Sequence, residues 1–311
     1  MSVAETDVAR DDPEHETWRE RLAYHTYAGV AWLGATLPTR TGRALFQLLG
    51  TLAYRVAPGV RATVAANQAR VIGRPVDDPL VRASTREAFR RYARYWYDAF
   101  AVVTWSDEQI LEAFAWDGVE HLRDPIAQGR GVIAVLPHMG NWDACGRSMR
   151  AHGLPMVAVA EQLRPERLYR LFVRQREAFG VRIIGLGGHG GIGKALTTAL
   201  AEGNVLALLA DRDLTGRGIA VDMFGAPRRL PAGPAMLALS TGAPVVVVAS
   251  YQTADGWRGI MRPLALPAPT GDRRTDATAI TRAMADAFEQ IIAASPPDWH
   301  LFQPGWPADD E

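Results

Sequence analysis

Short apolar segments alternate with amphipathic helical segments from about residue 114 onward, and this alternation constrains the fold more than any other feature. The apolar segments have the length of strands, and the segments between them have the period of helices. Repeated strand–helix units imply a mostly parallel central sheet flanked by helices. The sequence therefore predicts an α/β fold with strands near 131–137, 155–160, 182–185, 204–210, 243–250 and 256–261, and helices near 141–152, 165–179, 193–202, 233–241 and 275–294.

The first hundred residues lack a comparable strand pattern. Helices are expected at 18–37, 41–57, 61–72 and 79–103, with Pro38 and Pro58 as breakers. The last of these helices carries an aromatic stripe at spacings of three and four, which we expect to belong to the core: Phe89, Tyr92, Trp96 and Phe100. We predict a disordered acidic tail at 1–16 and a single domain at 17–311, with a helical part at 17–104 and an α/β core at 105–311.

The helical part has an uneven charge distribution. Residues 21–76 contain seven arginines and no acidic residue, although the whole chain has 34 basic and 34 acidic residues. A basic block suits an anionic surface, and its many Leu, Ala, Val, Tyr and Trp residues favour lipid over nucleic acid. We expect residues 21–76 to dock on an anionic membrane and expect no nucleic-acid partner; the alternative is the basic face of an ordinary soluble protein. The most apolar run, 23–37, is shorter than the roughly 20 residues that a spanning helix needs.

A histidine directly follows the strand expected at 131–137. His138 begins the segment His-Met-Gly-Asn-Trp-Asp, which places Asp143 in the first turn of the next helix. Open α/β sheets bind ligands at the carboxyl ends of their strands, and a carboxylate on one imidazole nitrogen leaves the other nitrogen as a base. We predict that His138 deprotonates a substrate hydroxyl and that Asp143 orients its ring. The alternative is structural, with a histidine ending the strand and an aspartate capping the helix.

Five segments together resemble the glycerolipid acyltransferases that carry an H-x4-D/E signature, and more closely the late acyltransferases of lipid A. They are HMGNWD at 138–143, ADRD at 210–213, MFG-x-P at 223–227, GPA at 233–235 and PDW at 297–299. Together they span about residues 130–305. HMGNWD combined with ADRDL looks most like the phosphatidylinositol mannoside acyltransferases within this superfamily.

The resemblance implies a reaction and a set of site residues. A fatty acyl group such as palmitoyl would pass from acyl-CoA to a mannose hydroxyl of a phosphatidylinositol mannoside, with His138 as general base, no acyl-enzyme, no cofactor and no metal. The protein would lie at the cytoplasmic face of the plasma membrane, peripheral or monotopic. For the oxyanion or the substrate we expect Arg176, Glu161, Asp211, Asp213 and Asn141, and for the acyl group or its donor Phe224, Gly225 and Arg228.

Alternative functions rest on other features. The segment Gly-Leu-Gly-Gly-His-Gly at 185–190, followed about twenty residues later by Asp211, resembles the dinucleotide fingerprint and would suit an NAD(P)-binding oxidoreductase. The triplet at 211–213 has the D-x-D form of metal-dependent glycosyltransferases, which is a weak signal. A late acyltransferase acting on another glycolipid is the third alternative. The single cysteine, Cys145, excludes a disulfide framework and a cysteine-based zinc site.

Overall fold

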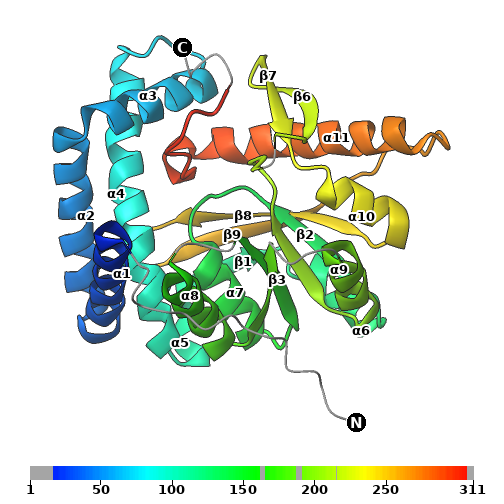
Figure 1. Cartoon of the computed structure of the whole chain (residues 1–311), viewed down its shortest axis with the longest axis horizontal. Helices are drawn as coiled ribbons and strands as arrows, with labels where there is room; N and C mark the ends of the chain where they lie inside the picture. The colour runs from blue at the N-terminus through cyan, green and yellow to red at the C-terminus, as the bar shows by residue number, and fades with distance from the viewer. Residues whose placement is uncertain (1–16, 162–164, 187–190, 215, 307–311) are drawn as a thin grey trace.

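The computed structural model describes residues 17–161, 165–186, 191–214 and 216–306. Its centre is a seven-stranded sheet in the order β1-β9-β8-β2-β5-β3-β4, in which β1 and β9 run antiparallel to the other five strands (Figure 1). The predicted α/β fold with a mostly parallel sheet is therefore confirmed. The strands are β1 (Phe114–Asp117), β2 (Val132–Leu136), β3 (Met156–Glu161), β4 (Val181–Leu186), β5 (Val205–Leu209), β8 (Val245–Gln252) and β9 (Trp257–Pro263).

Strand β2 lies in the middle of the sheet, and all five of its residues are buried. Its side chains alternate between two apolar clusters, as the period of a strand requires. On one face they meet α9 (Ile192–Ala201), α10 (Gly233–Thr241) and α11 (Arg273–Ala294). The opposite face is covered by α6 (Glu120–Ala127), α7 (Trp142–Ala151) and α8 (Glu166–Ala178), so helices flank both sides of the sheet (Figure 1).

The N-terminal helices form a layer along one side of this core (Figure 1). Helix α4 (Pro79–Ala101) is its centre, and α1 (Trp18–Thr36), α2 (Thr39–Val56) and α3 (Pro58–Ile72) pack against it. Helices α2 and α4 approach closely because Gly42 has no side chain: a Cβ there would lie 2.0 Å from the buried Tyr97 ring. Pro58 was expected only to break a helix, but it occupies the first turn of α3, where proline costs no hydrogen bond.

Several elements did not follow from the sequence pattern. Helix α5 (Asp107–Ala113), helix α6 and strand β1 were not predicted, nor was the hairpin of β6 (Ile219–Met223) and β7 (Ala226–Leu230), which packs on α11. The predicted tail at 1–16 lies outside the described residues. The division of 17–311 into a helical part and an α/β core within one domain stays a prediction.

Candidate active site

His138 lies two residues beyond the end of β2, and Asp211 lies two residues beyond the end of the neighbouring strand β5. The two strands are in register, with Leu136 opposite Leu209, so the two side chains emerge together at the carboxyl edge of the sheet. His138 Nδ1 and Asp211 Oδ1 are 2.6 Å apart. The imidazole is 18% exposed and the carboxylate is fully buried. Because Nδ1 faces Asp211, Nε2 is the ring nitrogen that remains for a substrate.

The negative charge of Asp211 determines which nitrogen of the His138 ring carries the proton. Burial alone would raise the pKa of Asp211, but the charge and hydrogen bond of His138, with help from Trp299 and Arg228, hold that pKa below its usual range. Trp299 Nε1 donates to Asp211 Oδ2 over 2.8 Å, and Arg228 Nη2 donates to the Asp211 carbonyl over 2.7 Å. An ionised Asp211 accepts a hydrogen bond from the Nδ1–H of His138, which leaves Nε2 as the basic nitrogen.

The C-terminal segment clamps this edge of the sheet. The backbone N–H of His300 donates to the carbonyl of His138 over 2.7 Å, and Gly140 donates its N–H to the carbonyl of Asp298 over 2.8 Å. The ring of His300 bonds the carbonyl of Gly140 through Nε2 at 2.9 Å. Burial lowers the pKa of His300 to about 3, so this ring is neutral near pH 7. The loop after β2 is therefore hydrogen-bonded to the C-terminal segment both at His138 and at Gly140.

Asp143 does not orient His138, and this expectation is wrong in its geometry. The aspartate occupies the second position of α7, where its carboxylate points toward α4 and α8. It accepts a hydrogen bond from the Tyr95 hydroxyl at 2.8 Å and from Arg176 Nε at 2.7 Å. Burial acts to lower the pKa of Arg176. The charge and hydrogen bonds of Asp143 have the larger effect, so the pKa of Arg176 is raised. Burial, and then the charge of Asp143, raise the pKa of Tyr95.

A cavity of about 470 Å³ opens beside His138 and runs between the sheet and α7. Its lining includes side chains from all seven strands of the sheet. Polar groups gather around His138, whereas the rest of the wall is apolar, with Leu136, Met149, Met156 and Met261 among its members. A larger and more open pocket, of about 720 Å³, lies at the β1 edge and includes neither His138 nor Asp211 in its lining. His138 lines the smaller cavity, and Asp211 contacts the His138 ring without lining that cavity itself.

The structure brings some of the other predicted residues to this cavity. Asp143, Arg176 and Glu161 all line it, the last from the exposed end of β3. Asn141 does not, because its side chain is fully buried and caps α7 by accepting from the backbone N–H of Ala144 at 2.9 Å. Its predicted contact with substrate is therefore not supported. Asp213 accepts a hydrogen bond from the backbone N–H of Gly218 and lines a neighbouring open pocket instead.

The residues predicted to hold the acyl group or its donor lie elsewhere. Phe224 and Gly225 form the turn between β6 and β7, where Phe224 adopts a left-handed φ of 51° and packs near Trp299. Neither lines the cavity, so the structure does not bring them to His138, and their contact with the acyl group or its donor stays a prediction. Arg228 is buried behind Asp211, where it supports the carbonyl of that residue.

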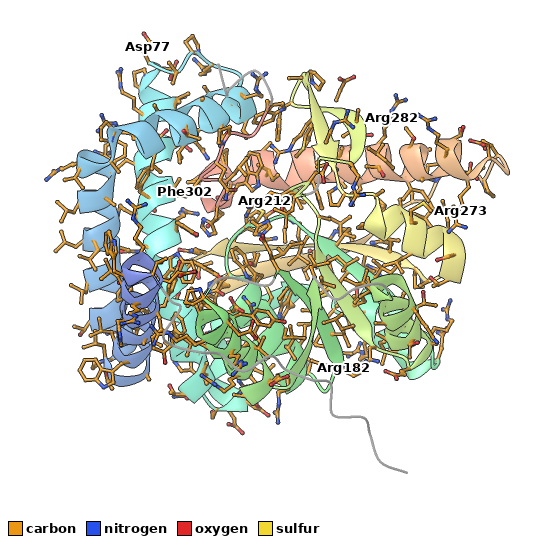
Figure 2. The ribbon with its side chains drawn as sticks, in the orientation of Figure 1. Asp77, Arg182, Arg212, Arg273, Arg282 and Phe302 are labelled. Carbon is orange, nitrogen blue, oxygen red and sulfur yellow. The ribbon has the colours of Figure 1, made fainter. Side chains whose placement is uncertain are left out.

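Sequence reasoning missed several lining residues. Tyr92, Tyr95 and Trp96 of α4 line the cavity, so the predicted aromatic stripe is divided between core and site. The only signal for them was their helical spacing, which also fits a core. Arg212 lines the cavity as well, and Figure 2 shows it between the sheet and α11, at the opposite end of the strands from Arg182.

The rival motifs gain no support from the geometry. Asp211 and Asp213 turn their carboxylates to different partners, and the part of the chain that the structure describes contains no cluster of three or more His, Cys, Asp or Glu side chains that could hold a metal ion. Residues 187–190 of the glycine-rich segment lie outside the described residues.

The comparisons with known proteins agree with the motifs. The model of the bacterial lipid A biosynthesis acyltransferase family matches residues 12–307. A phosphatidylinositol mannoside acyltransferase of Mycolicibacterium smegmatis is 40% identical over 260 residues, which cover 82% of this chain and 83% of that protein. A protein of the same name from Mycobacterium tuberculosis is 40% identical over 250 residues, covering 78% of this chain and 76% of that protein. The match along nearly the whole chain, with a histidine and its carboxylate at the mouth of an apolar cavity, means that the protein belongs to the bacterial lipid A biosynthesis acyltransferase family.

Proposed function

We propose that the protein transfers a long-chain fatty acyl group from acyl-CoA to a mannose hydroxyl of a phosphatidylinositol mannoside. The observation that carries the proposal is the pairing of His138 with buried Asp211 at the polar end of an otherwise apolar cavity. The family and the names of the relatives that are 40% identical support the class of acceptor.

The proposed chemistry is a direct attack on the thioester. His138 Nε2 takes the proton of the mannose hydroxyl while the hydroxyl oxygen bonds to the thioester carbonyl carbon. The tetrahedral intermediate then expels the thiolate of CoA, which takes the proton from the imidazolium. General-base assistance of this kind contributes roughly 10²- to 10⁴-fold, and ionised Asp211 stabilises the transient imidazolium.

An acyl-enzyme is not part of the proposal. Cys145 is buried on α7, and burial raises the pKa of its thiol to about 12. A thiol, unlike a thiolate, is a poor nucleophile. The acyl group therefore passes between the two substrates in one transfer.

Arg176 is the proposed donor to the oxyanion or to the substrate. Its guanidinium is held by Asp143 through Nε at 2.7 Å and Nη2 at 3.4 Å, which directs the side chain into the cavity wall. In this proposal Asp143 holds Arg176 in place, and it does not orient His138. Glu161 and Arg212 at the mouth offer an acceptor for sugar hydroxyls and a cation for phosphate.

The N-terminal helices supply the proposed membrane contact. Leu45, Leu48, Leu49, Leu52 and Val56 of α2 form an exposed apolar stripe at helical spacing. The surrounding block at 21–76 is basic, so we propose that it docks on anionic lipid at the cytoplasmic face of the plasma membrane. None of the described helices is both long and apolar enough to cross a bilayer.

The membrane contact has a direct test. Leu48→Glu combined with Leu52→Glu is expected to abolish co-sedimentation with phosphatidylglycerol-containing vesicles, because it places charge in the stripe. Leu266→Glu is the matched control, since Leu266 is also exposed but lies outside the helical layer. Equal binding by both variants would contradict the contact.

The reaction is tested by mass spectrometry of lipid products after incubation of the full chain with palmitoyl-CoA and mannosylated phosphatidylinositol. A lipid A precursor offered in parallel distinguishes another glycolipid acceptor. His138→Ala is expected to abolish acyl transfer with little change in Tm. Retained turnover in this variant would refute the role of His138, and the absence of any acylated mannolipid with wild-type protein would refute the proposed acceptor.

A further inference from the structure

Trp116 stands where the acyl cavity ends at the β1 side of the sheet. Among the residues that the structure describes, it is the one that lines both this cavity and the open pocket of about 720 Å³ at the β1 edge. Its indole therefore forms part of the wall between an apolar cavity that reaches His138 and a second space that opens to solvent.

The indole of Trp116 is fixed from three sides. Its Nε1 donates to Ser148 Oγ of α7 over 2.9 Å. Its ring stacks on Phe114 with centroids 4.2 Å apart and planes within 5°. The neighbouring strand β9 has Gly259 opposite it, where a Cβ would lie 2.1 Å from the ring, so the ring lies directly against the strand backbone. A ring held in this way cannot easily move aside for a longer ligand.

The charges of the cavity indicate which direction an acyl tail takes. From β2 toward β4, the described lining on the sheet is apolar apart from Glu161, and Arg176 of α8 adds a second charged group on that side. From β2 toward β1, the described lining on the sheet consists of Val248, Met261 and Trp116. An acyl tail gains free energy only where it leaves water for an apolar surface. Both arms offer such a surface, but the β4 arm also carries Glu161 and Arg176, so the β1 arm suits the tail better.

We propose that the indole of Trp116 closes the tail end of the acyl cavity and so limits the length of the acyl chain that the enzyme accepts. This inference rests on the proposed acyl transfer. Strands β9 and β8 separate β1 from β2, so the arm is about 14 Å long at the usual spacing of about 4.8 Å between strands. Chains longer than this arm meet the indole.

Trp116→Ala is expected to join the cavity to the second pocket. Each methylene that becomes buried contributes roughly fourfold in binding, so kcat/KM for an acyl-CoA two carbons longer than the wild-type optimum should rise roughly 15-fold relative to the optimum chain. Trp116→Leu removes less volume and is expected to give a smaller shift in the same direction, which keeps the test usable if the alanine variant unfolds. Competition among C14 to C20 acyl-CoA donors gives the profile of each variant.

Trp105→Ala is the matched control. Trp105 lines the second pocket but not the acyl cavity, so its removal enlarges that pocket without opening the wall. We expect its chain-length profile to match that of wild type. Phe179→Ala tests the opposite arm, because Phe179 lines the cavity near the start of β4.

The outcomes separate the inference from the proposed function. If wild type transfers acyl groups but both Trp116 variants keep its chain-length profile, the inference is overturned. A shift with Phe179→Ala and none with Trp116→Ala would also overturn it, since the tail would then follow the β4 arm. If wild type transfers no acyl chain of any length to any glycolipid, the proposed function itself fails.

Discussion

Replacement of Asp211 by asparagine tests the pairing on which the site depends. The substitution keeps the shape of the side chain and removes its charge. As a base, His138 becomes an imidazolium with its Nδ1 2.6 Å from the Asp211 carboxylate. At an effective dielectric constant of about 20, a charge pair at this distance is worth about 6 kcal/mol. The amide dipole of the substituted side chain still supplies part of this stabilisation of the imidazolium, so the expected net loss of stabilisation is about 4 kcal/mol.

A loss of about 4 kcal/mol in transition-state stabilisation corresponds to roughly 10³-fold in kcat. The KM of either substrate should change much less, because the carboxylate is fully buried and touches neither substrate in the proposed mode. Steady-state acyl transfer with palmitoyl-CoA gives both constants, and thermal unfolding checks that the variant is folded. Asp213→Asn is the matched control: it is the same substitution two residues away, on a carboxylate that bonds Gly218 instead of the imidazole.

The reasoning would be refuted by an Asp211→Asn enzyme that keeps kcat within tenfold of wild type. It would also be refuted if Asp213→Asn caused the larger loss, since the hydrogen bonds assign the imidazole to Asp211 alone among these two aspartates.

Three further predictions follow from the buried groups. Asp143→Asn leaves Arg176 without its carboxylate and should lower the free energy of unfolding by about 2–3 kcal/mol in urea titrations; an unchanged midpoint would contradict the ion pair. His300 has a pKa of about 3 in the folded protein and about 6.5 in the unfolded chain. Between these pH values the unfolded state binds more protons than the folded state. The free energy of unfolding therefore falls as the pH falls below about 6.5, by up to about 1.4 kcal/mol per pH unit. His300→Gln, which can still donate a hydrogen bond to the Gly140 carbonyl, should flatten this pH dependence in urea titrations from pH 6.5 to 4.5. If the free energy of unfolding kept the same slope against pH in this variant, the assignment of the pH dependence to His300 would be wrong. Cys145→Ala should retain acyl transfer, and its inactivity, or a trapped acyl-thioester on wild type, would disprove the direct mechanism.

The α/β core could be predicted because its strands are buried on both faces. Such strands appear as continuous apolar runs, and β2, β5 and β8 were found within a few residues of their limits. Strand β1 was not predicted because it is a four-residue edge strand in which only Phe114 is fully buried. The hairpin of β6 and β7 alternates buried with less buried residues over five positions each, including two arginines, and it gave no apolar run.

The site was only partly predictable for a different reason. The position of His138 followed from the strand before it, but its partner depended on which strand lies beside β2. Sequence distance favoured Asp143, whereas the sheet order places β5 and Asp211 next to β2. The helix that begins after Asn141 turns the Asp143 side chain toward Arg176. Strand order is a tertiary property, and no local pattern in the chain encodes it.

The clamp formed by Asp298, Trp299 and His300 has a consequence for the timing of activity during synthesis. Domains emerge from the ribosome N-terminus first, so a nascent chain exposes His138 and Asp211 long before the residues that hold their loop and carboxylate. Until then the backbone at His138 and Gly140 lacks its hydrogen bonds to the C-terminal segment, and Asp211 lacks its hydrogen bond from Trp299. In the proposed mechanism, the surroundings of the base are therefore complete only once the segment from Asp298 to His300 has been made.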